Sequence, residues 1–198
     1  MKRKNIWALD FSAPMLLLLP AAIGINYIGK LFAQLLNLPL WLDSIGTLLA
    51  SILGGPVIGA LSGLINNVLY GVLLDPVSFV YAITSVAMGL LAGYLSYIGF
   101  LANWKKVLAM SALVALAAAV VSTPLNIIFW GGETGLTWAD NFFYAAQETI
   151  KATWLCSFLA EILIDIPDKI ISVFICFAIY KGIPKNVLKI YQQDTNIK

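Results

Sequence analysis

The sequence predicts an all-α membrane protein with six transmembrane helices and both termini in the cytoplasm. Apolar residues make up 61% of the 198-residue chain and charged residues only 11%, which is about half the charged fraction of a typical soluble domain. Apolar segments of nearly membrane-spanning length recur along the chain, separated by short polar or glycine-containing segments. Basic and acidic residues also fall into alternate connections between these segments. Together these three observations predict one transmembrane domain over residues 1–198.

The apolar segments define the predicted helices in order. They cover residues 11–28, 42–53, 57–74, 79–101, 107–130 and 153–180. The second segment is short and is followed directly by Gly54, Gly55 and Pro56. Glycine and proline in succession mark a tight turn. We therefore expect the second and third helices to form a helical hairpin.

The basic residues predict the orientation of the chain. In a six-helix topology one side of the membrane receives Lys2, Arg3, Lys4, Lys105, Lys106, Lys181, Lys185, Lys189 and Lys198. Only Lys30 and Lys151 fall in connections on the other side, together with Asp43, Asp75, Glu133, Asp140 and Glu148. Lysine and arginine favour the cytoplasmic side. The N-terminus (residues 1–10) and the tail (182–198) are therefore predicted to be cytoplasmic and the long loop 131–151 to face outward, as in a multi-pass protein of a bacterial plasma membrane.

Several classes of chemistry lack the residues that they require. The chain contains no histidine, which excludes histidine-based general base catalysis and histidine-ligated zinc or haem. It also lacks a GxxxxGK[ST] phosphate-binding loop and a GxSxG nucleophile motif. Cys156 and Cys176 fall roughly five to six turns apart on the last predicted helix, too far apart to form a disulfide. We therefore expect no enzymatic activity, no metal, no cofactor and no nucleic-acid partner.

Four ionisable residues interrupt the last predicted helix: Glu161, Asp165, Asp168 and Lys169. Their spacing places them on one side of a helix. Ionisable groups at membrane depth are costly and usually mark a functional site or a buried pairing scheme. The stripe therefore predicts a polar interior or a contact surface, with an internal pair between Asp165 and Lys169 at i,i+4 as the alternative.

The long outward loop is a candidate ligand-binding element. It begins with flexible glycines and continues into a short amphipathic segment, a composition often found in lids and binding loops. The alternative is an interfacial segment anchored by Trp130 and Trp138. Polar and aromatic residues from the outer ends of the third to sixth helices converge on the same side. The predicted ligand-binding residues are Asn66, Asn67, Tyr81, Thr84, Asn126, Trp130, Trp138, Asp140 and Asn141; the amides of Asn66 and Asn67 could instead bond a neighbouring helix.

Three segments carry a family resemblance. They read LDSIGT at 42–47, GGPVIGALSGLINN at 54–67 and DPVSFVYA at 75–82. With the predicted topology, they resemble the S component of an energy-coupling factor (ECF) transporter. The resemblance implies a six-helix bundle that captures a vitamin or related micronutrient outside the cell. It also implies docking on a shared transmembrane scaffold that two ATPase subunits drive.

The family docks through an AxxxA pattern on the first helix, which this chain lacks in strict form. Small residues on the first and third helices permit close helix approach in lipid. The predicted docking residues are Ala21, Ala22, Gly24, Gly59 and Gly63.

The sequence leaves alternatives open for both the ligand and the class of function. The segments 130–148 and 165–173 resemble a subgroup associated with cobalamin uptake, and a smaller vitamin, a nucleoside-like compound or haem remain alternatives. A second function class is a stand-alone proton-coupled carrier in which Glu161, Asp165 and Asp168 relay protons. A third is a structural subunit of a larger complex, whose outward loop would bind nothing.

Overall fold

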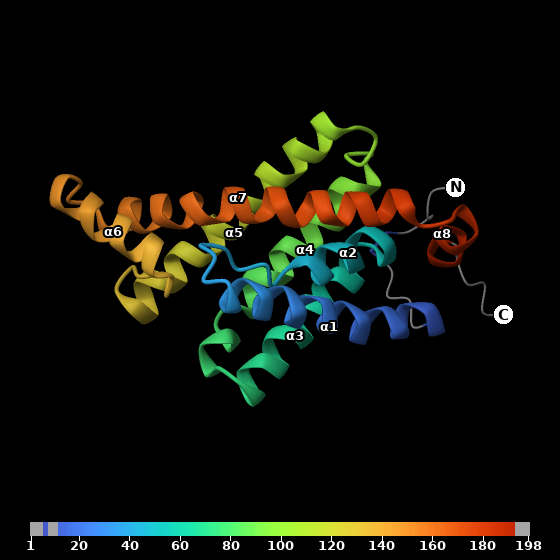
Figure 1. Ribbon diagram of the computed structural model, residues 1–198, viewed down its shortest axis with the longest axis horizontal. Helices are drawn as coiled ribbons and strands as arrows, with labels where there is room; N and C mark the ends of the chain where they lie inside the picture. Colours follow the sequence, from blue (N-terminus) through green and yellow to red (C-terminus); the bar gives the residue numbers. More distant parts are fainter. Residues whose placement is uncertain (1–5, 8–11, 193–198) are drawn as a thin grey trace.

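The computed structural model describes residues 6–7 and 12–192, and within them the chain is all-helical, without a strand (Figure 1). This confirms the predicted all-α class. The elements are α1 (Ala13–Leu35), α2 (Ile45–Gly54), α3 (Pro56–Leu73), the 3-10 helix η1 (Pro76–Phe79), α4 (Ala82–Tyr97), α5 (Trp104–Trp130), α6 (Thr137–Thr149), α7 (Thr153–Gly182) and α8 (Lys185–Gln192). The predicted cytoplasmic segment 1–10 lies largely outside the described residues.

Three of these helices, α1, α3 and α5, are long and apolar enough to cross a membrane. The helices α2 and α4 are apolar but shorter. The helix α7 is the longest, and its ionisable stripe interrupts an otherwise apolar sequence. The structure thus supports a membrane protein with three candidate spans, while six spans and cytoplasmic termini stay predictions.

Most predicted helices match observed ones, and the largest differences occur at connections. The first helix continues to Leu35, beyond the predicted end at residue 28. The predicted helix 79–101 is shorter, because residues 76–79 form η1 and α4 begins only at Ala82. Asp75 causes this early turn, since its side chain accepts a hydrogen bond from the Val77 amide. The short amphipathic segment of the outward loop is the helix α6.

The short helix α2 occupies the centre of the bundle. Nine of its ten residues are buried, and it contacts α1, α3, α4 and α7. Asn26 of α1 fixes its position. The Asn26 Oδ1 atom accepts from the Gly46 amide at 2.7 Å, and the Asn26 Nδ2 atom donates to Thr47 Oγ1 at 2.9 Å. The predicted hairpin with α3 turns at Gly55, whose φ of +92° favours glycine.

Small residues bring the helices of this chain together, and three of the predicted docking residues lie at such internal contacts. Ala22 is buried against α2, where a Cβ atom at Gly46 would meet the Ala22 carbonyl oxygen at 1.8 Å. Gly59 lies against Ser51 of α2, and Gly63 lies against Ser85 of α4. These three predicted docking residues are therefore occupied by internal packing. Ala21 and Gly24 remain exposed on α1.

The bundle has an apolar core, and it also exposes large apolar side chains on its outer surface. Large apolar side chains point outward from α1, α3 and α5, including Leu17, Leu35, Val72, Leu73 and Ile128. Buried positions include many amides, hydroxyls and charges, such as Asn26, Asn126 and Asp168. Extended exposed apolar surface marks a membrane or partner contact. This arrangement supports the predicted bilayer setting.

Candidate functional site

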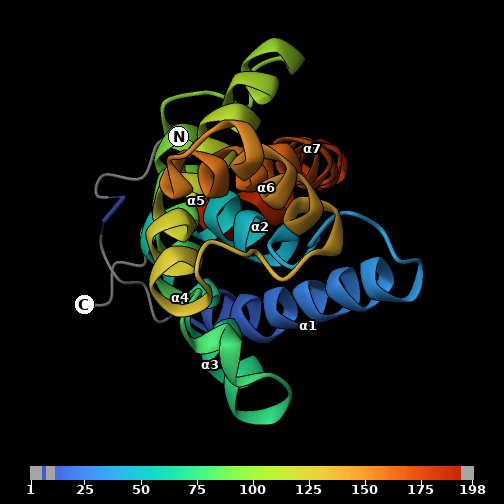
Figure 2. The same ribbon diagram turned by 90° about the vertical axis from the view of Figure 1, so that its left-hand side faces the viewer.

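The chain encloses a cavity of about 370 Å³, and its lining includes the residues 133–135 that directly precede α6. The helices α6 and α8 lie at opposite ends of the bundle (Figures 1 and 2). The lining residues come from α1, α3, α4, α5, α7 and the loops between them. They are Lys30, Gln34, Trp41, Asp43, Asn67, Asp75, Val77, Ser78, Tyr81, Thr84, Ser85, Met88, Ala118, Ser122, Trp130, Glu133, Thr134, Gly135, Glu161, Asp165 and Lys169. Volumes in this range are typical of small-molecule sites.

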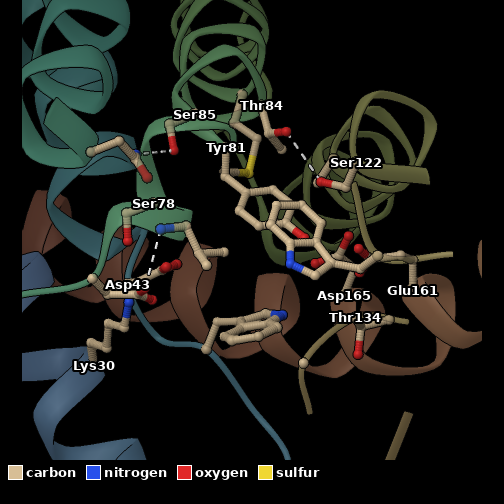
Figure 3. A pocket seen from close by; sticks show the side chains of 18 of the residues that line it. Lys30, Asp43, Ser78, Tyr81, Thr84, Ser85, Ser122, Thr134, Glu161 and Asp165 are labelled. Carbon is tan, nitrogen blue, oxygen red and sulfur yellow. Dashed lines mark hydrogen bonds between the residues drawn. The ribbon is translucent and has the colours of Figure 1, made fainter. Parts of the chain in front are cut away.

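Aromatic rings form one side of the cavity, where Tyr81 stacks on Trp130 (Figure 3). The ring centroids are 5.5 Å apart and the planes are inclined by 12°. The Tyr81 hydroxyl donates to Asn126 Oδ1 at 2.6 Å, and Asn126 Nδ2 donates to Glu161 Oε1 at 2.6 Å. This chain of hydrogen bonds joins α4, α5 and α7 and fixes the orientation of the Tyr81 ring.

Hydroxyl and amide groups form a second side. Thr84 Oγ1 and Ser122 Oγ lie 3.1 Å apart and share a hydrogen bond between α4 and α5 (Figure 3). Asn67 Nδ2 donates to Ser85 Oγ at 2.7 Å, which joins α3 to α4. These groups can both donate and accept hydrogen bonds. The cavity therefore offers adaptable polar contacts beside the aromatic side.

The ionisable stripe of α7 divides between the cavity and a neighbouring loop. Glu161, Asp165 and Lys169 line the cavity. Asp168 is fully buried, and its Oδ1 atom accepts hydrogen bonds from the Trp41 amide at 3.1 Å and the Leu42 amide at 2.8 Å. Lys169 Nζ is 2.5 Å from Asp168 Oδ2 and 3.6 Å from Asp165 Oδ1. The stripe is thus a polar interior that also contains the i,i+4 pair.

The loop 36–44 brings an aromatic and an acidic residue to the opening of the cavity. Trp41 and Asp43 both line it, and Asp168 holds the backbone of this loop through the Trp41 and Leu42 amides. Burial raises the pKa of Asp43, and the charges of Lys169 and Lys30 partly offset this effect. A carboxylate here is therefore near two lysines but poorly solvated.

The loop that precedes α6 forms another part of the cavity lining. Asp140 Oδ1 accepts from the Thr134 amide at 2.7 Å and from Thr134 Oγ1 at 3.0 Å. The Tyr144 hydroxyl donates to Glu133 Oε1. Ala139 and Phe143 anchor α6 against α7 in a small apolar cluster. The helix α6 thereby holds Glu133 and Thr134 at the cavity.

The predicted ligand-binding residues occupy three kinds of position. Four line the cavity: Asn67, Tyr81, Thr84 and Trp130. Two accept a hydrogen bond from a lining residue: Asn126 from Tyr81, and Asp140 from Thr134. Three do not line the cavity: Asn66 is buried in α3, while Trp138, which is 67% exposed, and Asn141 lie on the outer surface of α6. The ligand-binding role of the set stays a prediction.

Sequence reasoning missed the contribution of α1 and the loop that follows it. The lining residues of this region, Lys30, Gln34, Trp41 and Asp43, lie far in sequence from the lining residues of α3, α4, α5 and α7. The one available signal was Lys30, because few lysines fall on the predicted outer side. Ser85 and Ser122 gave no signal, since single serines in apolar helices commonly bond their own backbone.

A metal ion finds no evident ligand set in residues 6–7 and 12–192, where no group of three acidic or cysteine side chains is placed to hold one. Comparison with protein-family models, with curated proteins and with solved structures gives no match for this chain.

Proposed function

We propose that the chain is the substrate-binding membrane subunit of an ECF-type ABC importer. It captures a small molecule outside the cell and docks on a shared transmembrane scaffold driven by two ATPase subunits. The observation that carries the proposal is the polar cavity at one end of a bundle with an apolar exterior. A subunit that receives a ligand from water while embedded in lipid needs both features.

The distribution of charge supports an outward-facing cavity. Acidic residues, including Asp43, Asp75 and Glu133, lie at the cavity. Lys105 and Lys106 at the start of α5, and Lys181 and Lys185 near the junction of α7 and α8, do not line the cavity. By the positive-inside rule, the lysine-rich end is cytoplasmic.

The cavity volume bears on the choice of ligand. The sequence resemblance favours cobalamin, whereas a volume of about 370 Å³ suits a molecule of one or two ring systems. A corrinoid with its nucleotide loop is several times larger. We therefore propose the smaller-vitamin or nucleoside-like alternative as the ligand class, in preference to cobalamin or haem.

The proposal assigns no catalytic step to this chain, so energy comes from its partners. The sequence contains no phosphate-binding loop. The test compares vesicles that contain the chain alone with vesicles that also contain the scaffold and both ATPases, with mass spectrometry of co-purifying molecules to identify the substrate. We expect ATP-dependent accumulation only in the second preparation. Accumulation driven by ATP in the first would contradict the proposal.

A stand-alone proton-coupled carrier is the second candidate. Glu161 and Asp165 are buried and line the cavity, a placement that proton-coupled carriers use. Substrate uptake by liposomes that contain only this chain, driven by an imposed pH gradient and lost in Glu161→Gln, would favour this candidate over the importer.

A further inference from the structure

Negative charge is in excess around the cavity. Its lining contains five carboxylates and two lysines, namely Asp43, Asp75, Glu133, Glu161 and Asp165 against Lys30 and Lys169. Both lysines already have partners. Lys169 Nζ lies against Asp168, which does not line the cavity, and Lys30 Nζ lies 4.3 Å from the centroid of the Tyr70 ring. Carboxyl groups therefore outnumber lysines in the lining of the cavity.

Asp165 is the carboxylate with an unmet bonding requirement. It is 3% exposed, and its Oδ1 atom is 3.6 Å from Lys169 Nζ. Its Oδ2 atom is buried and has no hydrogen-bond partner within the described part of the chain. Other lining acids differ, since Glu161 accepts from Asn126 and Asp75 accepts from the Val77 amide. A buried carboxylate oxygen without a donor is costly.

Aromatic rings complete the same site. The Tyr81 and Trp130 rings stack on one side, and Trp41 also lines the cavity. The faces of such rings attract cations and also stack with planar ligands. Hydroxyl and amide groups at Thr84, Ser122 and Asn67 lie beyond the rings. The acidic residues, the aromatic rings and the neutral hydrogen-bonding groups together indicate which kind of ligand this cavity can bind.

We propose that the cavity binds an organic cation, a planar ring that carries a protonated amine or a positively charged ring nitrogen. The cationic nitrogen donates to Asp165, and the ring lies beside Tyr81 and Trp130. An organic cation fits better than a metal ion, because the described residues offer no cluster of three acidic or cysteine ligands. This inference rests on the proposed function only in taking the cavity as the substrate site.

Three indoles that differ mainly in charge test the proposal: tryptamine (cationic), tryptophol (neutral) and indole-3-propionate (anionic). Their binding to the full-length chain in nanodiscs of neutral lipid is measured by isothermal titration calorimetry. Because a buried charge-assisted contact strengthens binding, tryptamine should bind at least about tenfold more tightly than tryptophol. Indole-3-propionate should bind most weakly.

Two substitutions test whether Asp165 causes the preference for tryptamine over tryptophol. Asp165→Asn keeps the shape of the side chain and removes its charge, so the preference for tryptamine should fall about tenfold. Glu148→Gln is the matched control, since Glu148 is exposed on α6 and does not line the cavity. It should keep the wild-type preference. If Asp165→Asn fails to fold, Asp43→Asn at the cavity opening replaces it and should reduce the preference in the same direction.

Equal affinity for tryptamine and tryptophol, or tighter binding of indole-3-propionate, would overturn the proposal. So would the absence of tryptamine binding at about 1 mM, where a fragment of ordinary ligand efficiency binds such a site. Failure of the importer proposal looks different. In that case tryptamine preference persists, while the scaffold and ATPases give no ATP-dependent uptake.

Discussion

Single buried polar residues tie the elements of this bundle together. Asn26 joins α1 to α2, Asn126 joins α4 to α7, and Asp168 joins α7 to the loop 36–44. In a bilayer such groups find no water and must be satisfied internally. Each therefore specifies one arrangement of its neighbours, and together they fix the shape of the cavity.

The sequence identified polar residues of this kind but not which way they face. Asn66 and Asn67 are adjacent on α3, and only Asn67 lines the cavity. Neighbouring residues on a helix point about 100° apart, so one sequence cannot decide which of two asparagines faces inward. Trp138 and Asn141 do not line the cavity, because the packing of Ala139 and Phe143 on α7 sets the rotation of α6.

Replacement of Trp130 should weaken ligand capture. Trp130→Ala removes the ring that stacks on Tyr81 and one side of the cavity. Loss of such an aromatic anchor typically costs about 2 kcal/mol, so the amount of co-purifying small molecule should fall about tenfold or more. Trp138→Ala is the control, since Trp138 is 67% exposed outside the cavity. Equal loss in both variants, measured by mass spectrometry, would refute this assignment.

Asp168→Asn should destabilise the protein and release the loop 36–44. The substitution removes the negative charge that lies 2.5 Å from Lys169 Nζ and weakens acceptance from the Trp41 and Leu42 amides. Breaking a buried ion pair on one side typically costs about 3–5 kcal/mol. The thermal unfolding midpoint in detergent should therefore drop markedly, and hydrogen exchange should increase at residues 41 and 42. An unchanged midpoint would show that the contacts of Asp168 do not stabilise the fold.

The sequence predicted the bounds of the helices more closely than the contacts between them. Apolar length located α3, α5 and α7 closely, because these helices begin and end near charged, glycine or proline residues. The central position of α2 could not be predicted, since a short apolar helix reads the same at the centre or the edge of a bundle. The sequence also does not show which surfaces the glycines serve. Gly59 and Gly63 serve contacts within the chain, whereas the same small-residue pattern also fits a partner interface.

Close approach of α3 and α4 should depend on Gly89. A Cβ atom at this position would lie 2.6 Å from the backbone of Gly59 and Ala60, so Gly89→Ala must separate the two helices. Overpacking of this kind typically costs about 1–3 kcal/mol. Gly24→Ala is the matched control, because its Cβ atom would meet nothing within 4 Å. We expect a lower thermal unfolding midpoint for Gly89→Ala but not for Gly24→Ala. Equal midpoints for the two variants would show that the α3–α4 contact does not depend on Gly89.

The charge asymmetry of the protein and the position of the cavity together predict its orientation in the membrane. Cys156 and Cys176 are fully buried, so they should not react with a membrane-impermeant maleimide. Introduced cysteines then report the side of the membrane. Glu148→Cys on α6 should label in intact cells, and Lys105→Cys and Lys185→Cys should label only after permeabilisation. The opposite pattern would reverse the orientation, and labelling of all three in intact cells would contradict the bilayer topology.

Docking on the proposed partner scaffold should depend on the exposed small residues of α1. Ala22, Gly59 and Gly63 are committed to internal packing, which leaves Ala21 and Gly24 as the accessible part of the predicted surface. A bulky side chain fits at Gly24 without a clash inside the chain, but it prevents close approach of a second helix.

Gly24→Trp should therefore lower ATP-dependent uptake about tenfold or more in vesicles that contain the scaffold and ATPases, because loss of roughly 1.4 kcal/mol of docking energy already reduces association tenfold. Ligand capture by the isolated chain should stay unchanged, since Gly24 does not line the cavity. Ile128→Trp provides the control on α5, where Ile128 is 72% exposed. Wild-type uptake in Gly24→Trp would move the docking surface to another face, and loss of ligand capture in a folded protein would instead connect α1 to the binding site.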